Sequence, residues 1–359
     1  MRLLLVTSVD AWTRSVSTIH KWIAAGQKLG HDIAIYGEPN PELPGLRFTA
    51  DLSNLDLALF VLQVPSDLPD MPYLARVLDG VPREKRALVD LWGRYNDTIR
   101  VDHDFNHLEK MDGHQAWEWQ DAIAAVSDVI LQPTLSPRRA NVKSFLFHGF
   151  DETSVEKPYR NAAEAAAAWA KKPYGAMYVG SNWQRWHQVR DFLEGFAPVR
   201  KEAGPACLIG WDWHARPDWA EQMAIMGVDT DPALLKSLDV EVRDGTRFDE
   251  IVGLLGHAKF APVIHRPLFR QLGFVTNRSF ETFYADTIPV LMLSRDFVGQ
   301  IYGPAAPKLV PEQGVAAWVS DALKNPEAYW DAVLKTRAHL AATHSYAKRI
   351  EELTKATAR

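Results

Sequence analysis

Short apolar segments alternate with stretches of helical periodicity along this chain, and the alternation occurs twice in succession. In the first series the predicted strands span residues 3–7, 32–36, 57–61, 86–91, 129–131 and 142–147, and the predicted helices span 15–29 (behind a serine cap), 73–78 and 115–126. Apolar strands separated by helices assemble into a parallel sheet that helices cover on both faces. The first series therefore predicts a doubly wound, Rossmann-like α/β domain.

A polar and then alanine-rich segment, residues 151–172, interrupts the pattern and is typical of a helical linker at a domain boundary. The alternation then restarts. The predicted strands of the second series span residues 176–179, 206–210, 238–242, 260–264 and 288–293, and the predicted helices span 184–196, 248–255, 277–284, 315–323, 326–342 and 345–355. The 359 residues suffice for two hydrophobic cores, and we place the two α/β domains at 1–158 and 159–340.

Composition excludes several classes of protein. The net charge of −5 argues against a general nucleic-acid binder, although a local basic patch remains possible. The single cysteine, Cys207, lies in an apolar run, which rules out a disulfide within the chain and predicts a buried side chain. The short apolar run at residues 3–6 predicts a first strand rather than a signal peptide, and no segment approaches the length of a membrane span. We expect a cytoplasmic protein.

The segment from Thr276 to Glu281 carries the strongest functional pattern. Thr276 or Asn277 caps a predicted helix whose free N–H groups can bind phosphate oxygens. Arg278 lies in the first turn, where the helix dipole disfavours a cation unless an anion binds there too. Glu281 lies one turn later on nearly the same face and can accept both ribose hydroxyls of a nucleotide. The alternative is a simple ion pair between Arg278 and Glu281 on the helix surface.

This pattern, Arg278-x-Phe280-Glu281 followed by Ile288-Pro289-Val290, resembles the donor-binding helix and next strand of GT-B glycosyltransferases. It is most similar to the spore-maturation-type, exostosin-like and glycosyltransferase family 1 patterns. In those families the glutamate binds the ribose of the donor. The sequence differs at Asp286, where the families have glycine, and at residues 282–283, where they have Ala-Leu.

Three other segments agree with this resemblance in the same order along the chain. Residues 178–185 resemble the strand and glycine turn that open the donor domain, and residues 147–151 resemble the end of the acceptor domain. Residues 343–349 resemble the start of the last helix, which in this fold crosses back onto the N-terminal domain. The resemblance implies a GT-B fold, with two Rossmann-like domains facing a cleft and a returning helix at 341–359.

A basic loop after the strand at 260–264 carries His265, Arg266 and Arg270, which can neutralise a departing diphosphate. A solvated basic loop is the alternative. Trp211, after another strand end, either stacks on a base or sugar or belongs to an ordinary surface turn. The donor-binding residues expected from the motifs and the resemblance are Gly180, Ser181, Asn182, Arg185, His265, Arg266, Arg270, Thr276, Asn277, Arg278, Ser279 and Glu281.

An inverting transferase needs a general base for the acceptor hydroxyl. Asp97 and Asp10, both after predicted strands, are the first candidates, with His103 next, and Asp90 and Asp104 also lie in this half. Each can equally be a loop or capping residue. Residues 102–107 match no standard metal site, and GT-B enzymes generally work without a bound metal, so we expect neither metal nor cofactor.

These patterns predict transfer of a sugar from a nucleoside-diphosphate sugar, with UDP as the expected nucleotide, to a hydroxyl of an unidentified glycan, lipid, protein or modified base. A nucleotide-sugar epimerase and a non-catalytic binding module on the same fold are the alternatives. A narrower alternative is a transferase that acts on a modified DNA base. Its basic patch would comprise Arg94, Arg100, Arg138, Arg139 and Lys143.

Overall fold

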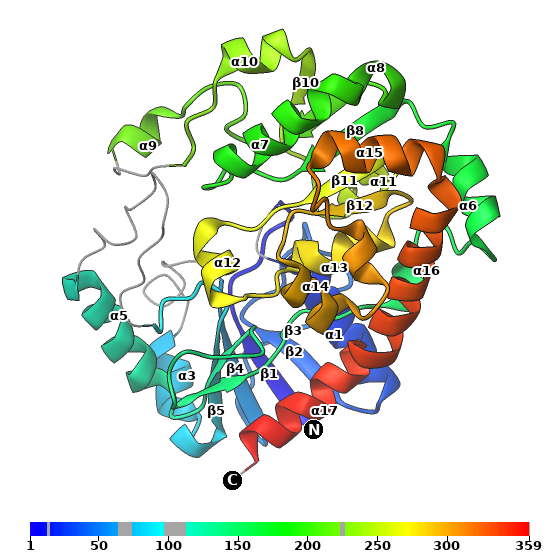
Figure 1. The fold of residues 1–359 in the computed structure, drawn as a ribbon. Helices are drawn as coiled ribbons and strands as arrows, with labels where there is room; N and C mark the ends of the chain where they lie inside the picture. The colour runs from blue at the N-terminus through cyan, green and yellow to red at the C-terminus, as the bar shows by residue number, and fades with distance from the viewer. Residues whose placement is uncertain (13–14, 64–73, 97–112, 223–226, 359) are drawn as a thin grey trace.

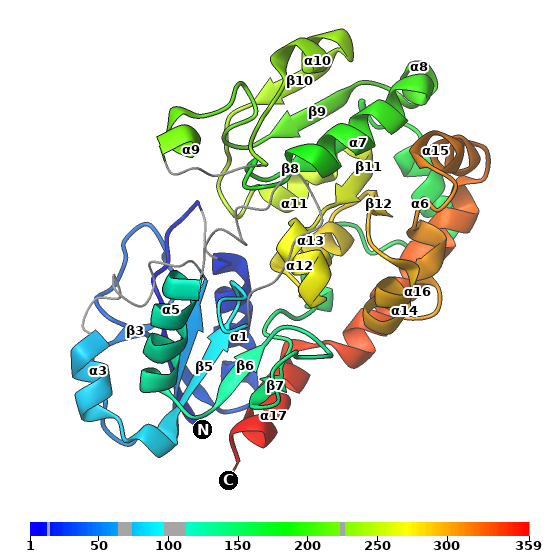
Figure 2. The ribbon, with the colours of Figure 1, turned by 60° about the vertical axis from the view of Figure 1, so that its left-hand side comes forward.

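The computed structural model describes residues 1–12, 15–63, 74–96, 113–222 and 227–358. These residues form two lobes, each built around a parallel sheet with helices on its faces (Figures 1 and 2). The strand order is β3-β2-β1-β4-β5-β6-β7 in the N-terminal sheet and β10-β9-β8-β11-β12 in the C-terminal sheet. The predicted pair of doubly wound α/β halves is therefore confirmed.

The N-terminal sheet follows the predicted apolar segments closely. Its strands are β1 (Arg2–Val6), β2 (Asp32–Tyr36), β3 (Phe48–Thr49), β4 (Leu57–Leu62), β5 (Arg86–Asp90), β6 (Ile130–Gln132) and β7 (Val142–Ser144), and its helices are α1 (Val16–Lys28), α3 (Leu74–Gly80) and α5 (Gly113–Val126). The two-residue edge strand β3 was not predicted, because so short a segment has no periodicity. The predicted serine cap of α1 is wrong, since Ser15 has a left-handed φ of 52° and its side chain caps nothing.

The C-terminal half holds more helices than the sequence predicts. Its strands are β8 (Tyr174–Val179), β9 (Ala206–Ile209), β10 (Val240–Arg243), β11 (Ala258–Val263) and β12 (Ile288–Leu291). Its helices are α6 (Ala162–Trp169), α7 (Trp186–Phe196), α8 (Arg200–Ala203), α9 (Asp218–Gln222), α10 (Pro232–Ser237), α11 (Ile251–Leu255), α12 (Pro267–Leu272), α13 (Asn277–Tyr284), α14 (Arg295–Tyr302), α15 (Val315–Lys324) and α16 (Pro326–Thr343). The alanine-rich segment forms α6, which packs on α16. Of the helices that were not predicted, α12 bears most on the site.

The last helix, α17 (Tyr346–Thr357), packs on the N-terminal lobe although it follows the C-terminal one in the chain (Figure 1). Its Tyr346, Ile350 and Leu353 are buried in the core that contains Ile19 and Trp22 of α1. The chain crosses between the lobes beside a parallel bridge that joins residues 150 and 345. Burial of this apolar face ties the end of the chain to its beginning.

Asp286 stands where the resembling families have glycine, and the structure gives it a structural role. Its carboxylate accepts a 2.7 Å hydrogen bond from Nζ of Lys172, and less than a tenth of either side chain is exposed. Asp286 also has a negative φ, so the backbone does not need glycine there. The aspartate that replaces the family glycine therefore forms a buried ion pair, which joins the turn after α13 to Lys172 at the end of the predicted linker.

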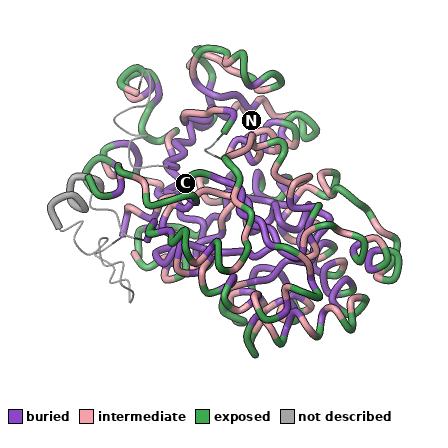
Figure 3. The backbone as a smooth tube through the Cα atoms, turned by 90° about the horizontal axis from the view of Figure 1, so that it is seen from above, coloured by how far each residue is buried: buried purple, intermediate pink, exposed green. Residues whose placement is uncertain are grey.

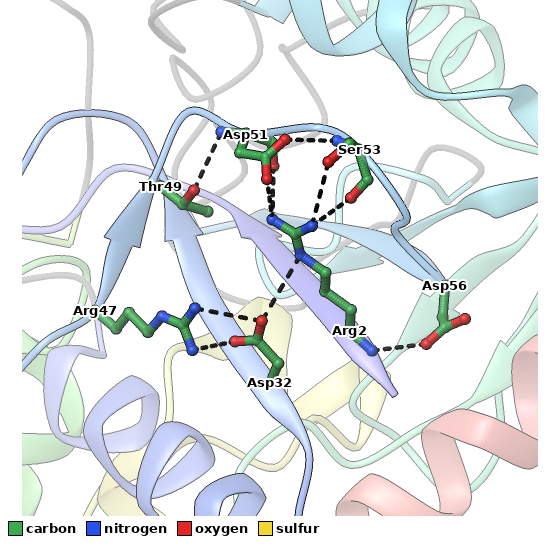
Figure 4. Close-up of polar contacts among 7 residues, drawn as sticks. All are labelled: Arg2, Asp32, Arg47, Thr49, Asp51, Ser53 and Asp56. Carbon is green, nitrogen blue, oxygen red and sulfur yellow. Dashed lines mark hydrogen bonds and ion pairs between the residues drawn. The ribbon is translucent and has the colours of Figure 1, made fainter.

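Polar contacts also join the start of β1 to β2 and to the loop after β3 (Figure 4). The guanidinium of Arg2 pairs with Asp51 and Asp32, and its backbone N–H donates to Asp56. Hydrogen bonds from Arg2 and then from Ser53 hold the pKa of Asp51 below its usual value. Buried backbone segments run through the interior of the molecule in Figure 3, and exposed segments lie mainly around its outside. Within the described ranges, no helix is long and apolar enough to cross a bilayer.

Candidate functional site

A cavity of about 190 Å³ lies at the carboxyl ends of the C-terminal strands. Ligands of open α/β sheets bind at this edge, because the loops that leave the strands converge there. Its walls include Gly245 and Thr246 after β10, Gly210 and Trp211 after β9, Gly180 and Ser181 after β8, Ile264, His265 and Arg266 after β11, and Thr276 and Arg278 at the start of α13. The N-terminal lobe contributes Trp12 from the loop after β1.

The strand order sets the order of these groups along the cavity. Because the sheet runs β10-β9-β8-β11, the loops with Gly245 and Trp211 lie at one end. The loop with Arg266 and the N-terminus of α13 lie at the other end, and the glycine turn at Gly180 lies between them. The cavity therefore has an aromatic end and a cationic end.

Glycine is required in the middle of the cavity. Gly180 and Gly210 follow neighbouring strands, and both have a φ of +152°, which disfavours L side chains. A Cβ on Gly210 would lie 2.2 Å from the carbonyl oxygen of Gly180. The same oxygen accepts a 2.7 Å hydrogen bond from Nε1 of the buried Trp213. The two turns therefore pack closely against each other in the wall of the cavity.

Arg266 is the central group of the cationic end. Its guanidinium lies between the rings of Trp92 and Phe269, 4.0 Å and 3.9 Å from their centroids. Burial, followed by the positive charges of Arg185 and Arg94, lowers its pKa. Its Nε has no hydrogen-bond partner among the described residues. A buried cation that faces other cations is costly unless an anion joins them, so this end is suited to a phosphate group.

His265 belongs to the same end of the cavity. Its side chain is 2% exposed, and its Nε2 lies 3.0 Å from Oγ of Ser279. Burial, followed by the charges of three nearby arginines, lowers the pKa of His265 to about 3. Without a bound anion the ring of His265 is therefore neutral at neutral pH, and its part in neutralising a diphosphate stays a prediction. The ring lines the cavity and contacts Ser279 and the capping residue Thr276 of α13.

The N-terminus of α13 has the predicted form. Thr276 caps the helix, and its N–H donates a 3.1 Å hydrogen bond to Oγ of Ser279. Arg278 lines the cavity from the first turn. Its Nη1 lies 3.1 Å from Oε2 of Glu281, so the alternative ion pair is present as well. This ion pair does not exclude ligand binding, because Arg278 lines the cavity while it contacts Glu281.

Glu281 makes contacts that the sequence did not predict. Its Oε1 accepts hydrogen bonds from Oγ of Ser17, at 2.7 Å, and from Nδ2 of Asn277, at 2.6 Å. Ser17 belongs to α1 of the N-terminal lobe, so the carboxylate joins the two lobes. Only 3% of Glu281 is exposed. With Arg278 at Oε2, three of the roughly four acceptor positions of this carboxylate are occupied within the chain.

The structure brings together seven of the twelve predicted donor-binding residues around the cavity: Gly180, Ser181, Arg185, His265, Arg266, Thr276 and Arg278. The other five are not among its lining residues. Asn182 is buried and donates to Thr230 and Asp212, and Ser279 contacts His265. Arg270 is exposed, and its positive charge contributes to the lowered pKa of His265. Asn277 and Glu281 lie behind the cavity, at the contact between the lobes.

The structure describes only some of the candidate bases. Asp97, His103 and Asp104 lie outside the described residues. Asp10 is half-buried beside the site, and its Oδ1 accepts the N–H of Trp12 at 2.8 Å. Asp90 is fully buried, and its two oxygens accept five N–H groups, from Gln132 and from the backbone of residues 92–95. Asp90 therefore organises the loop after β5 and is not available as a base.

Sequence reasoning missed two contributors to the site. Trp12 lies in an ordinary polar loop of the sequence, and only its 46% exposure beside a cavity singles it out. Trp92 follows β5 in the N-terminal lobe but stacks on Arg266 of the C-terminal lobe. Contacts of this kind join residues far apart in the chain, and no local pattern records them. No three potential metal ligands gather anywhere in the described part of the chain.

Comparisons with known proteins support the fold. No protein-family profile matches the chain, and neither does any curated protein sequence. Solved structures do match the chain. The T4 phage β-glucosyltransferase BGT with UDP-glucose has 14% identity and a TM-score of 0.57, and the match covers 100% of this chain and 99% of the BGT chain. The α-glucosyltransferase AGT with UDP has 11% identity and a TM-score of 0.58, with coverages of 100% and 99%. HepE of Anabaena, with UDP and glucose, has 8% identity and a TM-score of 0.55, with coverages of 99% and 98%.

The matches cover 99% to 100% of this chain, so the likeness includes both lobes and the returning helix. The chain has the GT-B architecture of these glycosyltransferases. BGT is described as a DNA-modifying enzyme, and a further AGT structure holds UDP and a 13-mer DNA. One BGT structure holds UDP and Mn²⁺. At this level of identity, the likeness establishes the fold alone.

Proposed function

We propose that this protein transfers a sugar from a UDP-sugar to an acceptor hydroxyl. The observation that carries the proposal is the polarity of the cavity, with Arg185, Arg266 and Arg278 at one end and Trp211 at the other. A nucleoside diphosphate has the same polarity, with a planar base at one end and two phosphates at the other. The uridine donors of BGT, AGT and HepE support the choice of nucleotide.

The reaction would use the cationic end to stabilise the leaving group. The acceptor oxygen bonds to the anomeric carbon while the bond from that carbon to the diphosphate breaks. The acceptor proton passes to a base, and UDP leaves with its new negative charge against Arg266 and Arg278. The N-terminus of α13 would add neutral backbone donors to the same phosphates.

The other roles follow from position. Glu281 would bind the ribose hydroxyls after exchanging its contact with Ser17. Asp10, Asp97 and His103 remain the candidate bases, and Asp10 is the one that the structure describes, beside Trp12. The relation to spore-maturation-type and exostosin-like families remains a proposal based on residues 278–290. Metal independence is likewise proposed, on the grounds that three arginines already supply the positive charge.

For the acceptor, we favour a carbohydrate hydroxyl, as the glucose complex of HepE suggests. Three described members of the proposed basic patch contact only neutral groups of the chain, so they keep their positive charge. Arg138 donates to Gln271, Arg139 lies over the ring of Tyr95, and Lys143 donates to Ala356. DNA with a hydroxylated base is the second candidate, since BGT and AGT cover the whole chain in the comparison.

Incubation with UDP-glucose and two sets of acceptors tests the proposal. One set contains mono- and disaccharides, and the other contains duplexes with a hydroxymethylated base. We expect UDP release together with a hexose mass increment on one set. UDP-glucose that is converted to an epimer without an acceptor would point to an epimerase. UDP binding with no turnover on any acceptor would point to a non-catalytic module.

A further inference from the structure

Two exposed tryptophans from different lobes meet at the aromatic end of the cavity. Trp12 follows β1 of the N-terminal lobe and Trp211 follows β9 of the C-terminal lobe. Their ring centroids lie 6.3 Å apart in an edge-to-face arrangement, and both rings line the cavity. They are 46% and 40% exposed, whereas most large apolar side chains of the described residues are buried. Large aromatic rings left in contact with water beside a cavity offer a surface for a planar ligand.

The ring of Trp211 occupies space that a side chain at position 245 would need. A Cβ on Gly245 would lie 2.3 to 2.6 Å from three ring atoms of Trp211. Gly245 has no left-handed φ, so the close approach of the ring, and not the backbone, is what excludes a side chain there. The loop after β10 and the ring of Trp211 therefore form one continuous wall of the cavity.

The position of Trp12 depends on contacts between the lobes. The N–H of Phe248 donates a 3.2 Å hydrogen bond to the carbonyl oxygen of Ala11, directly before Trp12. The ring of Phe248 stacks on His20 of α1, with centroids 5.5 Å apart. Phe248 also packs against the small apolar cluster that contains Ala11 and Val16. The loop after β10 thus holds the N-terminal loop over the cavity.

We propose that Trp12 is a donor-binding residue of the N-terminal lobe, and that the nucleobase of the donor binds against the Trp12–Trp211 pair. This inference rests on the proposed function, and it adds that both lobes build the donor site. The base is the favoured occupant because the cationic groups that bind phosphates lie at the opposite end of the same cavity. A base stacked on an aromatic ring makes a contact that inorganic pyrophosphate cannot make.

Titration calorimetry with UDP and with inorganic pyrophosphate tests the inference. We expect Trp12→Ala and Trp211→Ala each to weaken UDP binding about tenfold or more, because base stacking on an aromatic ring contributes on this scale. Pyrophosphate affinity should change less than about twofold in both variants. Gly245→Val keeps both tryptophans but displaces Trp211, and it should weaken UDP in the same way. Leu29→Ala, at an exposed apolar residue elsewhere on the N-terminal lobe, is the matched control.

The outcomes separate the two proposals. If UDP binds the native protein and Trp12→Ala equally well, the inference is overturned and the proposed function stands. Equal weakening of UDP and pyrophosphate in Trp12→Ala also overturns the inference, since the residue then affects the whole site. If the native protein does not bind UDP, the proposed function is overturned, and the inference with it. Each variant is compared with the native protein by circular dichroism, so that a folding defect is identified separately.

Discussion

The hydroxyl of Ser17 donates a 2.7 Å hydrogen bond to the carboxylate of Glu281, across the contact between the two lobes. Glu281 is also the residue proposed to bind the ribose of the donor. Because Oε1 of this carboxylate already accepts from Ser17 and Asn277, a ribose hydroxyl that binds this oxygen competes with them. Donor binding and the arrangement of the lobes are therefore coupled through one side chain.

This competition predicts that Ser17→Ala strengthens UDP binding. Removal of the hydroxyl leaves Glu281 with one donor fewer to exchange, and one such hydrogen bond corresponds to about a 2- to 10-fold change in affinity. Calorimetry with UDP measures the effect, and Ser237→Ala, at an exposed serine bonded to its own helix, is the control. Weaker binding in Ser17→Ala would mean instead that Ser17 holds Glu281 in its productive position.

The buried position of Arg266 predicts a large effect on both nucleotide and pyrophosphate. Arg266→Ala should weaken each by about tenfold or more, because a charge-assisted hydrogen bond to phosphate is lost. Arg266→Lys should be intermediate, since lysine keeps the charge but not the planar stack between Trp92 and Phe269. Arg295→Ala, at an exposed ion pair with Glu312, serves as control. Unchanged pyrophosphate affinity in Arg266→Ala would contradict the phosphate assignment.

The ion pair between Lys172 and Asp286 predicts a stability effect without a binding effect. Asp286→Gly restores the family residue but leaves Lys172 buried without its partner, and should lower the free energy of unfolding by about 3–5 kcal/mol. Addition of Lys172→Met should recover much of this loss, and the UDP affinity of the folded variants should be native. Urea denaturation measures the first effect. An Asp286→Gly protein as stable as the native one would show that the pair contributes little.

Buried histidines predict the pH dependence of stability. Burial lowers the pKa of His148, His265 and His344 to about 3. The unfolded chain binds these protons near pH 6.5, so this contribution to stability is complete above pH 6.5 and falls as the pH falls towards 3. Each histidine contributes a slope of about 1.4 kcal/mol per pH unit. Denaturation between pH 7.5 and 5 should show a shallower slope for His148→Gln, and an identical slope would contradict its neutral, buried state.

The proposal of metal independence predicts that a chelator changes the transfer rate by less than about twofold. The positive charge at the diphosphate would come from arginine side chains rather than from a divalent ion. Turnover is measured with and without EDTA, and then with added Mn²⁺, the ion present in one BGT structure. Loss of activity with EDTA that Mn²⁺ restores would disprove the proposal.

The fold was largely predictable because its signal is local. Apolar runs such as residues 57–61 and 86–91 are strands buried on both faces, and such strands stand out in the sequence. Thr276 and Ser279 form the helix N-terminus that the local pattern indicates. The edge strand β3 and the helix α12 were missed, because two and six residues are too few to show a period.

The candidate site was predictable only within the C-terminal lobe. Gly180, Arg266 and Arg278 lie at strand or helix ends, where sequence alone indicates a ligand edge. The neutral state of His265 depends on burial among arginines from several loops, which no motif encodes. The contacts of Trp12 with Trp211 and of Ser17 with Glu281 cross between the lobes, so only the three-dimensional structure reveals them.

Thermal unfolding with a panel of nucleotides tests the central claim most directly. The native protein and Glu281→Ala are melted with UDP, GDP, ADP, CMP and dTDP, and Glu312→Ala, at an exposed ion pair, is the control. A ligand at 100 times its Kd stabilises the folded state by about 2.7 kcal/mol, which raises the midpoint measurably. We predict a shift with UDP in the native and control proteins that is lost in Glu281→Ala. If none of the nucleotides shifts the native midpoint, the cavity is not a donor site and the account is contradicted.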